Sequence, residues 1–179
     1  IVLAGGESRR MGEDKALILI QGKPLLQHHI ELLCPVVQQV FVAANLNRLS
    51  YRQFSSLEDI GIRFIEDGLS GSEGPLSGLL SGMQASDKPY LLVLSCDHFG
   101  LTVDTALKLY AAIEQTGADV ACLNVAGRVQ PLLSVMRTAL CEDLQHFLES
   151  GERSVMKWLQ ALSVANVTVD AAGGWYNLN

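Results

Sequence analysis

Apolar runs of strand length alternate with helix-patterned segments along nearly the whole chain of 179 residues. The strand-like runs lie at residues 1–4, 39–44, 61–67, 90–96, 118–124, 131–136 and 164–169. The amphipathic segments with helical spacing lie at residues 24–36, 74–86, 103–117, 138–151 and 152–162. Strands that alternate with helices favour parallel pairing, since each crossover helix returns the chain to the same end of the sheet. We therefore predict an α/β fold: one Rossmann-like domain over residues 1–179, with a doubly wound, mostly parallel sheet and helices on both faces.

The composition restricts the kinds of protein that the chain can be. Hydrophobic residues make up 49% of the chain and charged residues 18%, which is enough apolar material for a packed core. The 13 basic and 19 acidic residues give a net charge of −6, which argues against a nucleic-acid partner bound by charge alone. No apolar run approaches the roughly 18 residues of a membrane span, so no membrane partner is expected.

The cysteines indicate the compartment. The chain has four of them: Cys34, Cys96, Cys122 and Cys141. None of their spacings forms a C-x-x-C pair, so they are interpreted as buried thiols rather than as a metal site or a disulfide framework. Buried thiols without disulfides are typical of a reducing compartment, and we expect the protein to be cytoplasmic.

The segment LAGGESRRMGEDK, residues 3–15, places glycines and cations directly after the first predicted strand. In parallel α/β sheets, ligands bind beyond the carboxyl ends of the strands. Gly5 and Gly6 allow a sharp turn whose backbone N–H groups can cradle an anion. Arg10 and Lys15 can neutralise phosphate oxygens. The spacing matches neither G-x-x-x-x-G-K-[ST] nor G-x-G-x-x-G. A surface turn with solvated arginines is the alternative, but polar segments after the other strands favour a nucleotide-phosphate site.

Two aspartates follow other predicted strands. Asp97 ends the most apolar strand, where a carboxylate is costly to bury unless it is paired or binds a metal. Beside a triphosphate such a carboxylate is expected to hold Mg²⁺, and a turn or cap aspartate before Leu101 is the alternative. Asp67 precedes a glycine-rich turn and either faces the nucleotide or forms the turn. Gly74 and Pro75 then open a predicted helix, whose N-terminus favours anions or polar ligand edges.

Several other residues are expected to have structural roles. His28 and His29 lie in a helical pattern and are expected to face partly outward. His98, a single histidine in a loop, is expected to be incidental to the chemistry, although a general-base role stays open. Trp158 and Trp175 are expected to pack rather than to stack on a ligand.

Longer motifs resemble one family of nucleotidyltransferases. The stretch LAGGESRRMGEDKALILIQGKPLLQH resembles their opening signature, L-A-G-G-x-S-x-R-M-G-x-D-K. IEDGLSGSEGPLSGLLSGM resembles a later E-D-x-x-x-x-x-G-P-L-x-G segment, and LVLSCDHFG resembles a C-D-x-P strand end. RVQPLLSV, GERSVMKWL and WYNLN have counterparts in the same order. The opening signature belongs to the whole superfamily, whereas its combination with GPLSG and GERSVM resembles the molybdenum cofactor guanylyltransferases, also called molybdopterin-guanine dinucleotide biosynthesis A proteins.

This resemblance implies an activity and a set of partners. The activity is the transfer of GMP from GTP to molybdopterin that carries molybdenum, with release of pyrophosphate and formation of the guanine dinucleotide cofactor. GTP and molybdopterin would be the main partners, with transient contacts to cofactor-biosynthesis proteins or molybdoenzymes. The implied catalytic residues are Arg10, Lys15 and Asp97, and Asp97 would bind Mg²⁺ near the α-phosphate. The implied GTP-binding residues are Leu3, Ala4, Gly5, Lys15, Asp67 and Asp97.

The chain departs from the family pattern at two positions, and two other functions stay open. Ala43 stands where the family often has Asn, which removes or moves a polar contact to the nucleotide. Phe99 replaces the usual proline after C-D-x. One alternative is a related nucleotidyltransferase that uses CTP or makes a nucleotide-sugar, which the GPLSG segment disfavours. The other is a non-catalytic nucleotide-binding regulatory domain, which the retention of Lys15, Asp67 and Asp97 together disfavours.

Overall fold

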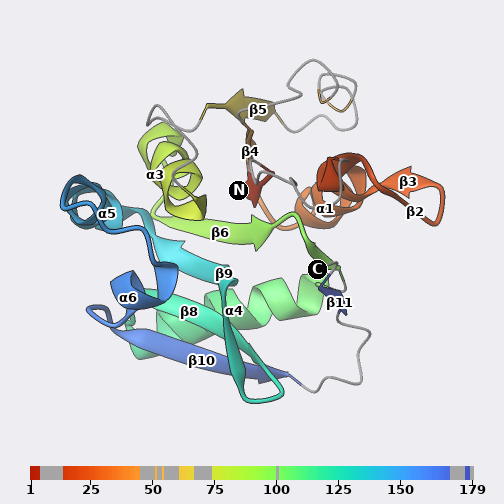
Figure 1. Ribbon diagram of the computed structural model, residues 1–179. Coiled ribbons are helices and arrows are strands. Elements are labelled where there is room, and N and C mark those ends of the chain that lie inside the picture. Colours follow the sequence, from red (N-terminus) through yellow and green to blue (C-terminus); the bar gives the residue numbers. More distant parts are fainter. Residues whose placement is uncertain are drawn as a thin grey trace.

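The computed structural model of the chain describes residues 1–4, 14–44, 51, 54, 61–66, 74–99, 101–169 and 176–177. Seven strands form the central sheet, in the order β10-β8-β9-β6-β1-β4-β5 (Figure 1). Their bounds are β1 Val2–Leu3, β4 Val40–Ala43, β5 Ile62–Ile65, β6 Tyr90–Ser95, β8 Val120–Val125, β9 Arg128–Arg137 and β10 Val164–Val169. Each of the seven predicted strands is present, so this part of the prediction is confirmed.

The sheet is mostly parallel, as predicted. β1 pairs in parallel with β4 and β6, β4 with β5, and β8 with β10. β9 is antiparallel to both of its neighbours, β6 and β8. Only Ala126 and Gly127 join β8 to β9, and a two-residue turn can connect only antiparallel strands. Both turn residues have positive φ, 50° and 80°, which is the backbone conformation of the favoured hairpin turn.

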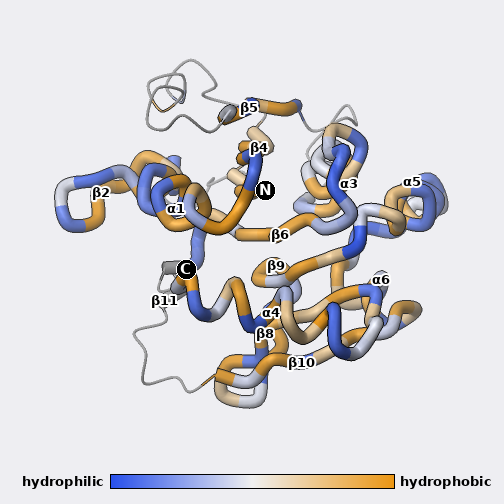
Figure 2. The backbone as a smooth tube through the Cα atoms, turned by 180° about the vertical axis from the view of Figure 1, so that it is seen from behind, coloured by the Kyte–Doolittle hydropathy of each residue, from blue (hydrophilic) through white to orange (hydrophobic). Residues whose placement is uncertain are grey.

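Helices cover both faces of the sheet (Figure 1). Their bounds are α1 Leu25–Leu33, α3 Pro75–Ala85, α4 Val103–Thr116, α5 Cys141–Glu149 and α6 Val155–Leu159, with short 3-10 turns η1 Lys15–Leu17 and η3 Thr138–Leu140. Residues of α3, α5 and α6 form one apolar cluster with side chains of one sheet face, such as Val93 and Cys122. α1 and α4 cover the opposite face, in clusters that include Val42 and Leu94. Figure 2 shows hydrophobic stretches on the strands beneath these helices, and the doubly wound arrangement is confirmed.

Two short pairs of strands are not predicted by the sequence pattern. β2 (Leu19–Ile20) and β3 (Lys23–Pro24) form a hairpin directly before α1. β7 (His98–Phe99) pairs antiparallel with β11 (Tyr176–Asn177), which brings the end of the chain beside the strand that follows Asp97. Strands of two residues are too short to show the alternation by which longer strands are recognised.

Two expectations about the helices can be compared with the structure. Trp158 of α6 is 1% exposed, and its indole Nε1 donates to Asp143 Oδ1 at 2.7 Å, so its role as a packing residue is confirmed. Trp175 lies outside the described residues. Within the part of the chain that the structure describes, no helix has the length and apolar character needed to cross a membrane.

The start of α4 gives a prediction for stability. Thr102 has extended backbone angles, and its hydroxyl accepts from Thr105 N at 3.2 Å, so it is the N-cap of α4. Loss of an N-cap side chain leaves a helix N–H group without its partner. Thr102→Ala should therefore lower the free energy of unfolding by about 1 kcal/mol, measured by urea denaturation. Thr102→Ser keeps the hydroxyl and should stay close to wild type. Equal stability of the Ala variant and the wild type would contradict the cap.

Candidate active site

The middle of the parallel half of the sheet brings Leu3, Ala4 and Asp97 to one edge. β1 lies between β4 and β6, and Leu3 is level with the last residue of each neighbour. Ala4 N donates to Ala43 O at 2.9 Å, and Cys96 N donates to Leu3 O at 3.1 Å. Asp97 is the next residue along the chain. Residues predicted from two separate strands therefore lie together at the carboxyl edge of the sheet, where α/β proteins of this kind bind ligands.

Ser95 and His98 both contact one carboxylate oxygen of Asp97. Ser95 Oγ donates to Asp97 Oδ1 at 2.5 Å. His98 Nδ1 lies 2.9 Å from the same oxygen, but off the direction of a regular hydrogen bond. Burial alone would raise the pKa of Asp97, but the contacts of His98 and Ser95, together with the charge of Lys15, outweigh burial and hold this pKa well below its ordinary value. Asp97 is therefore ionised at neutral pH, although its side chain is only 21% exposed.

His98 connects Asp97 to two other parts of the fold. Its Nε2 lies 3.3 Å from Gln130 Oε1 on β9, and its main-chain oxygen accepts from His29 Nε2 of α1 at 2.7 Å. A histidine that was expected to be incidental thus contacts the carboxylate predicted to bind metal. The outward orientation expected for His29 is wrong, because this residue is only 3% exposed, whereas His28 is partly exposed as expected. Burial lowers the pKa of His29, which favours the neutral imidazole. Because a carbonyl oxygen can only accept, the proton of this ring lies on Nε2.

Lys15 begins η1, a short turn that is fixed by its neighbours. Asp14 caps the turn, because its Oδ1 accepts from Ala16 N at 3.0 Å. Asp14 Oδ2 accepts from the hydroxyl of Tyr51, a residue that is 1% exposed. Burial, together with this contact, raises the pKa of Tyr51, so the phenol remains a protonated donor. Ala16 is buried in the cluster that α1 covers, and Lys15 is half-buried beside it.

η1 and the end of β6 contribute to one buried apolar cluster, which includes Ala16 and Cys96. The positive charge of Lys15 acts to lower the pKa of Cys96 and of Asp97. Burial nevertheless raises the pKa of the Cys96 thiol to about 12, helped by the carboxylates of Asp14 and Asp97. The thiol is therefore neutral and unreactive. The chain neighbours of Lys15 and Asp97, which are Ala16 and Cys96, thus belong to the same buried cluster.

The remaining predicted features lie partly outside the described residues. Three predicted site residues fall there: Gly5, Arg10 and Asp67. The helix start at Gly74 and Pro75 is confirmed, since Pro75 is the first residue of α3. Gly74 has a φ of 79° and a ψ of −173°, a conformation that favours glycine. In the first turn of α3, Ser77 is 1% exposed, and its Oγ has no hydrogen-bond partner among the described residues.

A magnesium ion would suit the donor set around Asp97. Among the described residues, no group of three or more His, Cys, Asp or Glu side chains is placed to hold a metal ion. Mg²⁺ does not need such a cage, because it is commonly bound by one or two carboxylates and by substrate phosphates, and it keeps several waters. An ionised carboxylate beside the Ser95 hydroxyl fits this pattern, with the other oxygen ligands coming from a bound triphosphate.

Several residues around this site are not predicted by the sequence. Gln130 reaches His98 from β9, Tyr51 supports Asp14, and β11 places Asn177 opposite His98 in register. Asp14 has a recognisable signal, because an aspartate directly before a helical turn is a common N-cap. The other contacts join segments that are far apart in the chain and have no local pattern.

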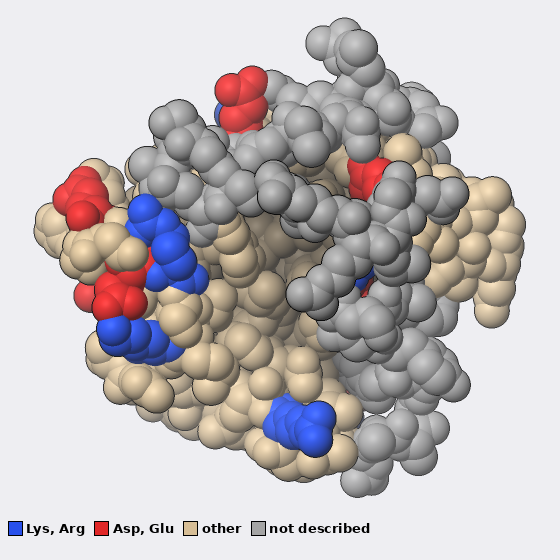
Figure 3. Space-filling view, in the orientation of Figure 1, with Lys and Arg blue, Asp and Glu red and all other residues tan. Residues whose placement is uncertain are grey.

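Charges of both signs are mixed on the face of the molecule shown in Figure 3. Lys and Arg side chains lie next to Asp and Glu side chains around α5 and α6. One ion pair of this region joins Lys157 to Glu152. Binding a nucleic acid by charge requires a broad surface of positive sign, and the mixed charges around α5 and α6 do not form one.

The chain is similar to proteins of known name over most of its length. A model of the MobA-like NTP transferase domain matches residues 1–165. The molybdenum cofactor guanylyltransferase of Shewanella putrefaciens strain CN-32 is 33% identical over 181 residues, which cover all of this chain and 90% of the relative. The protein of the same name from Shewanella sp. strain W3-18-1 is 36% identical over 159 residues, which cover 88% of this chain and 78% of the relative.

Solved structures share the fold. Molybdopterin-guanine dinucleotide biosynthesis protein A from Archaeoglobus fulgidus has a TM-score of 0.75 and 23% identity, over 94% of this chain and 82% of that one. The 2-C-methyl-D-erythritol 4-phosphate cytidylyltransferase from Thermus thermophilus has a TM-score of 0.69 and 21% identity, over 99% of this chain and 91% of that one. These likenesses show a nucleotidyltransferase fold, as predicted, and the fold does not distinguish between the bases that such enzymes use.

Proposed function

Because the chain belongs to the MobA-like NTP transferase family, we propose that it transfers GMP from GTP to molybdopterin that carries molybdenum. Pyrophosphate is released, and the guanine dinucleotide form of the cofactor is made. The observation that carries this proposal is the 33% identity, along the whole chain, to a molybdenum cofactor guanylyltransferase. Ala16 and Cys96, the chain neighbours of Lys15 and Asp97, lie in one buried cluster, and this arrangement supports a catalytic role over a purely regulatory one.

The chemistry needs alignment and charge neutralisation more than it needs a base. An oxygen of the terminal phosphate of the pterin attacks the α-phosphorus of GTP, and the bond from that phosphorus to the bridging oxygen of the β-phosphate breaks. The attacking oxygen is already negatively charged, so no strong base is required. Lys15, with Arg10, would neutralise the departing pyrophosphate, and the fixed end of the sheet would align the reacting groups. The rigid pairing of β1 with β4 and β6 supports such alignment.

The nucleotide-binding residues are assigned as part of the same proposal. Leu3, Ala4 and Gly5 would contact the nucleotide through the end of β1, and Asp67 would contact the nucleoside. Asp97 would hold Mg²⁺, which when bound supplies positive charge at the phosphate oxygens. The ionised state of Asp97 supports this role, because Mg²⁺ prefers charged oxygen ligands.

The cellular setting belongs to the proposal as well. GTP and molybdopterin are the substrates. Transient contact with the proteins that make the cofactor would deliver molybdopterin, and contact with the proteins that use it would collect the product. We place the enzyme, as one NTP transferase domain, in the cytoplasm. None of the four cysteines forms a disulfide among the residues that the structure describes, which supports a reducing compartment.

A direct assay tests the proposed reaction. The chain is incubated with GTP, Mg²⁺ and molybdenum-loaded molybdopterin, and both pyrophosphate and the dinucleotide are measured. We expect one pyrophosphate for each dinucleotide formed. Pyrophosphate release without the dinucleotide would leave a nucleotidyltransferase with another acceptor, and release of neither product would overturn the proposed function.

The choice of base gives a second prediction. The start of α3 offers main-chain groups of residues 74–77 and the buried Ser77 hydroxyl, which suit the donors and the acceptor on the edge of guanine. A base with a mismatched edge would leave at least one buried polar group without its partner, at a cost of about 1–3 kcal/mol. GTP should therefore bind about tenfold or more tightly than CTP or ATP, as measured by isothermal titration with Mg²⁺ present.

Two outcomes of that titration show whether Ala43, which stands where the family often has Asn, affects the choice of base. This residue is 1% exposed, in the apolar cluster with α3, so its methyl group offers the base no polar contact. If CTP binds as tightly as GTP and is consumed at the same rate, the guanylyl assignment is wrong and the CTP-using alternative replaces it. A clear preference for GTP shows that selectivity does not depend on an asparagine at position 43.

A further inference from the structure

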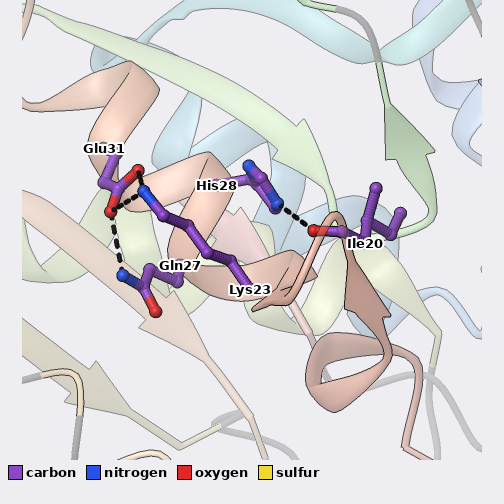
Figure 4. A network of polar contacts seen from close by, with 5 residues as sticks. All are labelled: Ile20, Lys23, Gln27, His28 and Glu31. Carbon is purple, nitrogen blue, oxygen red and sulfur yellow. Dashed lines mark hydrogen bonds and ion pairs between the residues drawn. The ribbon is translucent and has the colours of Figure 1, made fainter.

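Two adjacent histidines on α1 donate hydrogen bonds to two different parts of the candidate site. His28 Nε2 donates to the main-chain oxygen of Ile20 in the β2–β3 hairpin at 2.8 Å (Figure 4). His29 Nε2 donates to the main-chain oxygen of His98 at 2.7 Å. Both acceptors are carbonyl oxygens, so each imidazole must carry its proton on Nε2. Adjacent residues on a helix point about 100° apart, which allows neighbours to reach separate elements.

The bond of His28 holds the segment that contains Lys15. Lys15 lies five residues before Ile20, and the segment between them is η1 and the first strand of the hairpin. The end of η1 is also attached to α1, because Leu25 N donates to Ile18 O at 2.9 Å. Figure 4 shows Lys23, next to the turn of the hairpin, reaching Glu31 on α1, where Nζ and Oε2 are 2.9 Å apart. α1 therefore fixes the hairpin, and with it η1, through several contacts.

The bond of His29 holds the segment that contains Asp97. Its acceptor, the oxygen of His98, belongs to the residue directly after Asp97. The ring of His98 in turn lies against the Asp97 carboxylate. His29 is 3% exposed, so water cannot easily replace this contact if it is lost. The bond spans 69 residues of sequence and joins α1 to the end of β6.

We propose that His28 and His29 are positioning residues that make α1 a common brace for Lys15 and Asp97. This inference rests on the proposed function, in which Lys15 meets the phosphates of the nucleotide and Asp97 acts close to the α-phosphorus. Transfer needs both groups at a fixed separation, and a displacement of about 1 Å can cost up to 100-fold in rate. The two histidines hold the two groups to one rigid helix, one through each side chain.

The brace predicts a different kinetic change for each histidine. His28→Leu removes the bond to the hairpin, and Lys15 is proposed to meet the phosphates of bound GTP as well as the departing pyrophosphate. This variant should therefore raise the KM for GTP about tenfold and lower kcat by a smaller factor. His29→Leu removes the bond behind Asp97, so it should lower kcat about tenfold and change the KM for GTP little. His28→Gln and His29→Gln keep a donor near the position of Nε2 and should recover most of the lost activity. His146→Leu, at an exposed histidine of α5, is the matched control and should match the wild type.

Three results would overturn the brace. One is wild-type kinetics in both Leu variants. Another is that both Leu variants show the same fall in kcat and the same rise in KM, that these changes simply follow a lower melting temperature, and that the Gln variants do not recover activity. The third result needs no variant and no substrate. Long-range ¹H–¹⁵N spectra of the free wild-type protein should show the Nε2–H form of both histidines. An Nδ1–H form of either histidine contradicts the hydrogen bond proposed for it. These spectra also decide the case if a Leu variant does not fold.

A wild type that does not turn over GTP contradicts the proposed function itself, whereas an active wild type with unaffected Leu variants contradicts only the brace.

Discussion

Replacement of Asp97 by alanine should lower turnover by roughly 10²–10³-fold, the usual loss when one main electrostatic group is removed from an active site. The reason is that Asp97 is an ionised, partly buried carboxylate directly after β6, beside the carboxyl end of β1. In the proposed mechanism, Mg²⁺ would then lose a carboxylate ligand. The measurement is kcat/KM for pyrophosphate release, together with circular dichroism to show that the fold is retained.

Two further variants separate charge from shape at this position. Asp97→Asn keeps the size of the side chain and loses the charge, so it should be nearly as inactive as the alanine variant. Asp104→Ala removes an exposed carboxylate of α4, which is paired with Lys108, and should leave turnover unchanged. Turnover close to wild type in both Asp97 variants would remove this residue from the mechanism.

The fold was predictable because its elements are long enough to carry a periodic pattern. The apolar runs at 39–44 and 118–124 are buried strands, and the amphipathic run at 103–117 is α4. The antiparallel direction of β9 does not follow from the length or the apolar pattern of the strand. It follows from a two-residue turn with positive φ at Ala126, a residue that has no special preference for such a turn. Periodicity alone does not predict that conformation.

The candidate site was predictable where it depends on strand ends and not where it depends on contacts between distant segments. The ends of β1 and β6 come together because the strands are neighbours in a parallel sheet, which brings Ala4 and Asp97 to one edge. The contact of His29 with the main chain at position 98 depends on how α1 packs, and nothing in the local pattern indicates it. A buried histidine with one donated bond has the same helical spacing as an exposed one, so its outward placement was the wrong expectation.

Replacement of Lys15 by alanine should weaken GTP binding roughly 100-fold, within the range expected for the loss of charge-assisted hydrogen bonds. The ammonium group is proposed to contact the phosphates, so guanosine, which has none, should bind both proteins equally. The position of Lys15 supports this difference, because η1 is fixed by the Asp14 cap and by burial of Ala16. Isothermal titration with GTP and with guanosine measures both effects, and the ratio of the two changes isolates the phosphate contribution.

Control variants separate the loss of positive charge in Lys15→Ala from a structural effect of the substitution. Lys15→Arg keeps the positive charge and should recover part of the GTP affinity, although its planar fork has a different hydrogen-bonding geometry. Lys108→Ala, at an exposed lysine on α4, controls for a general loss of positive charge. A phosphate contact also predicts that the difference between wild type and Lys15→Ala shrinks as salt is added, because ions screen exposed charge interactions. Equal weakening of GTP and guanosine by Lys15→Ala would mean that the lysine does not contact phosphate, and its proposed role would be wrong.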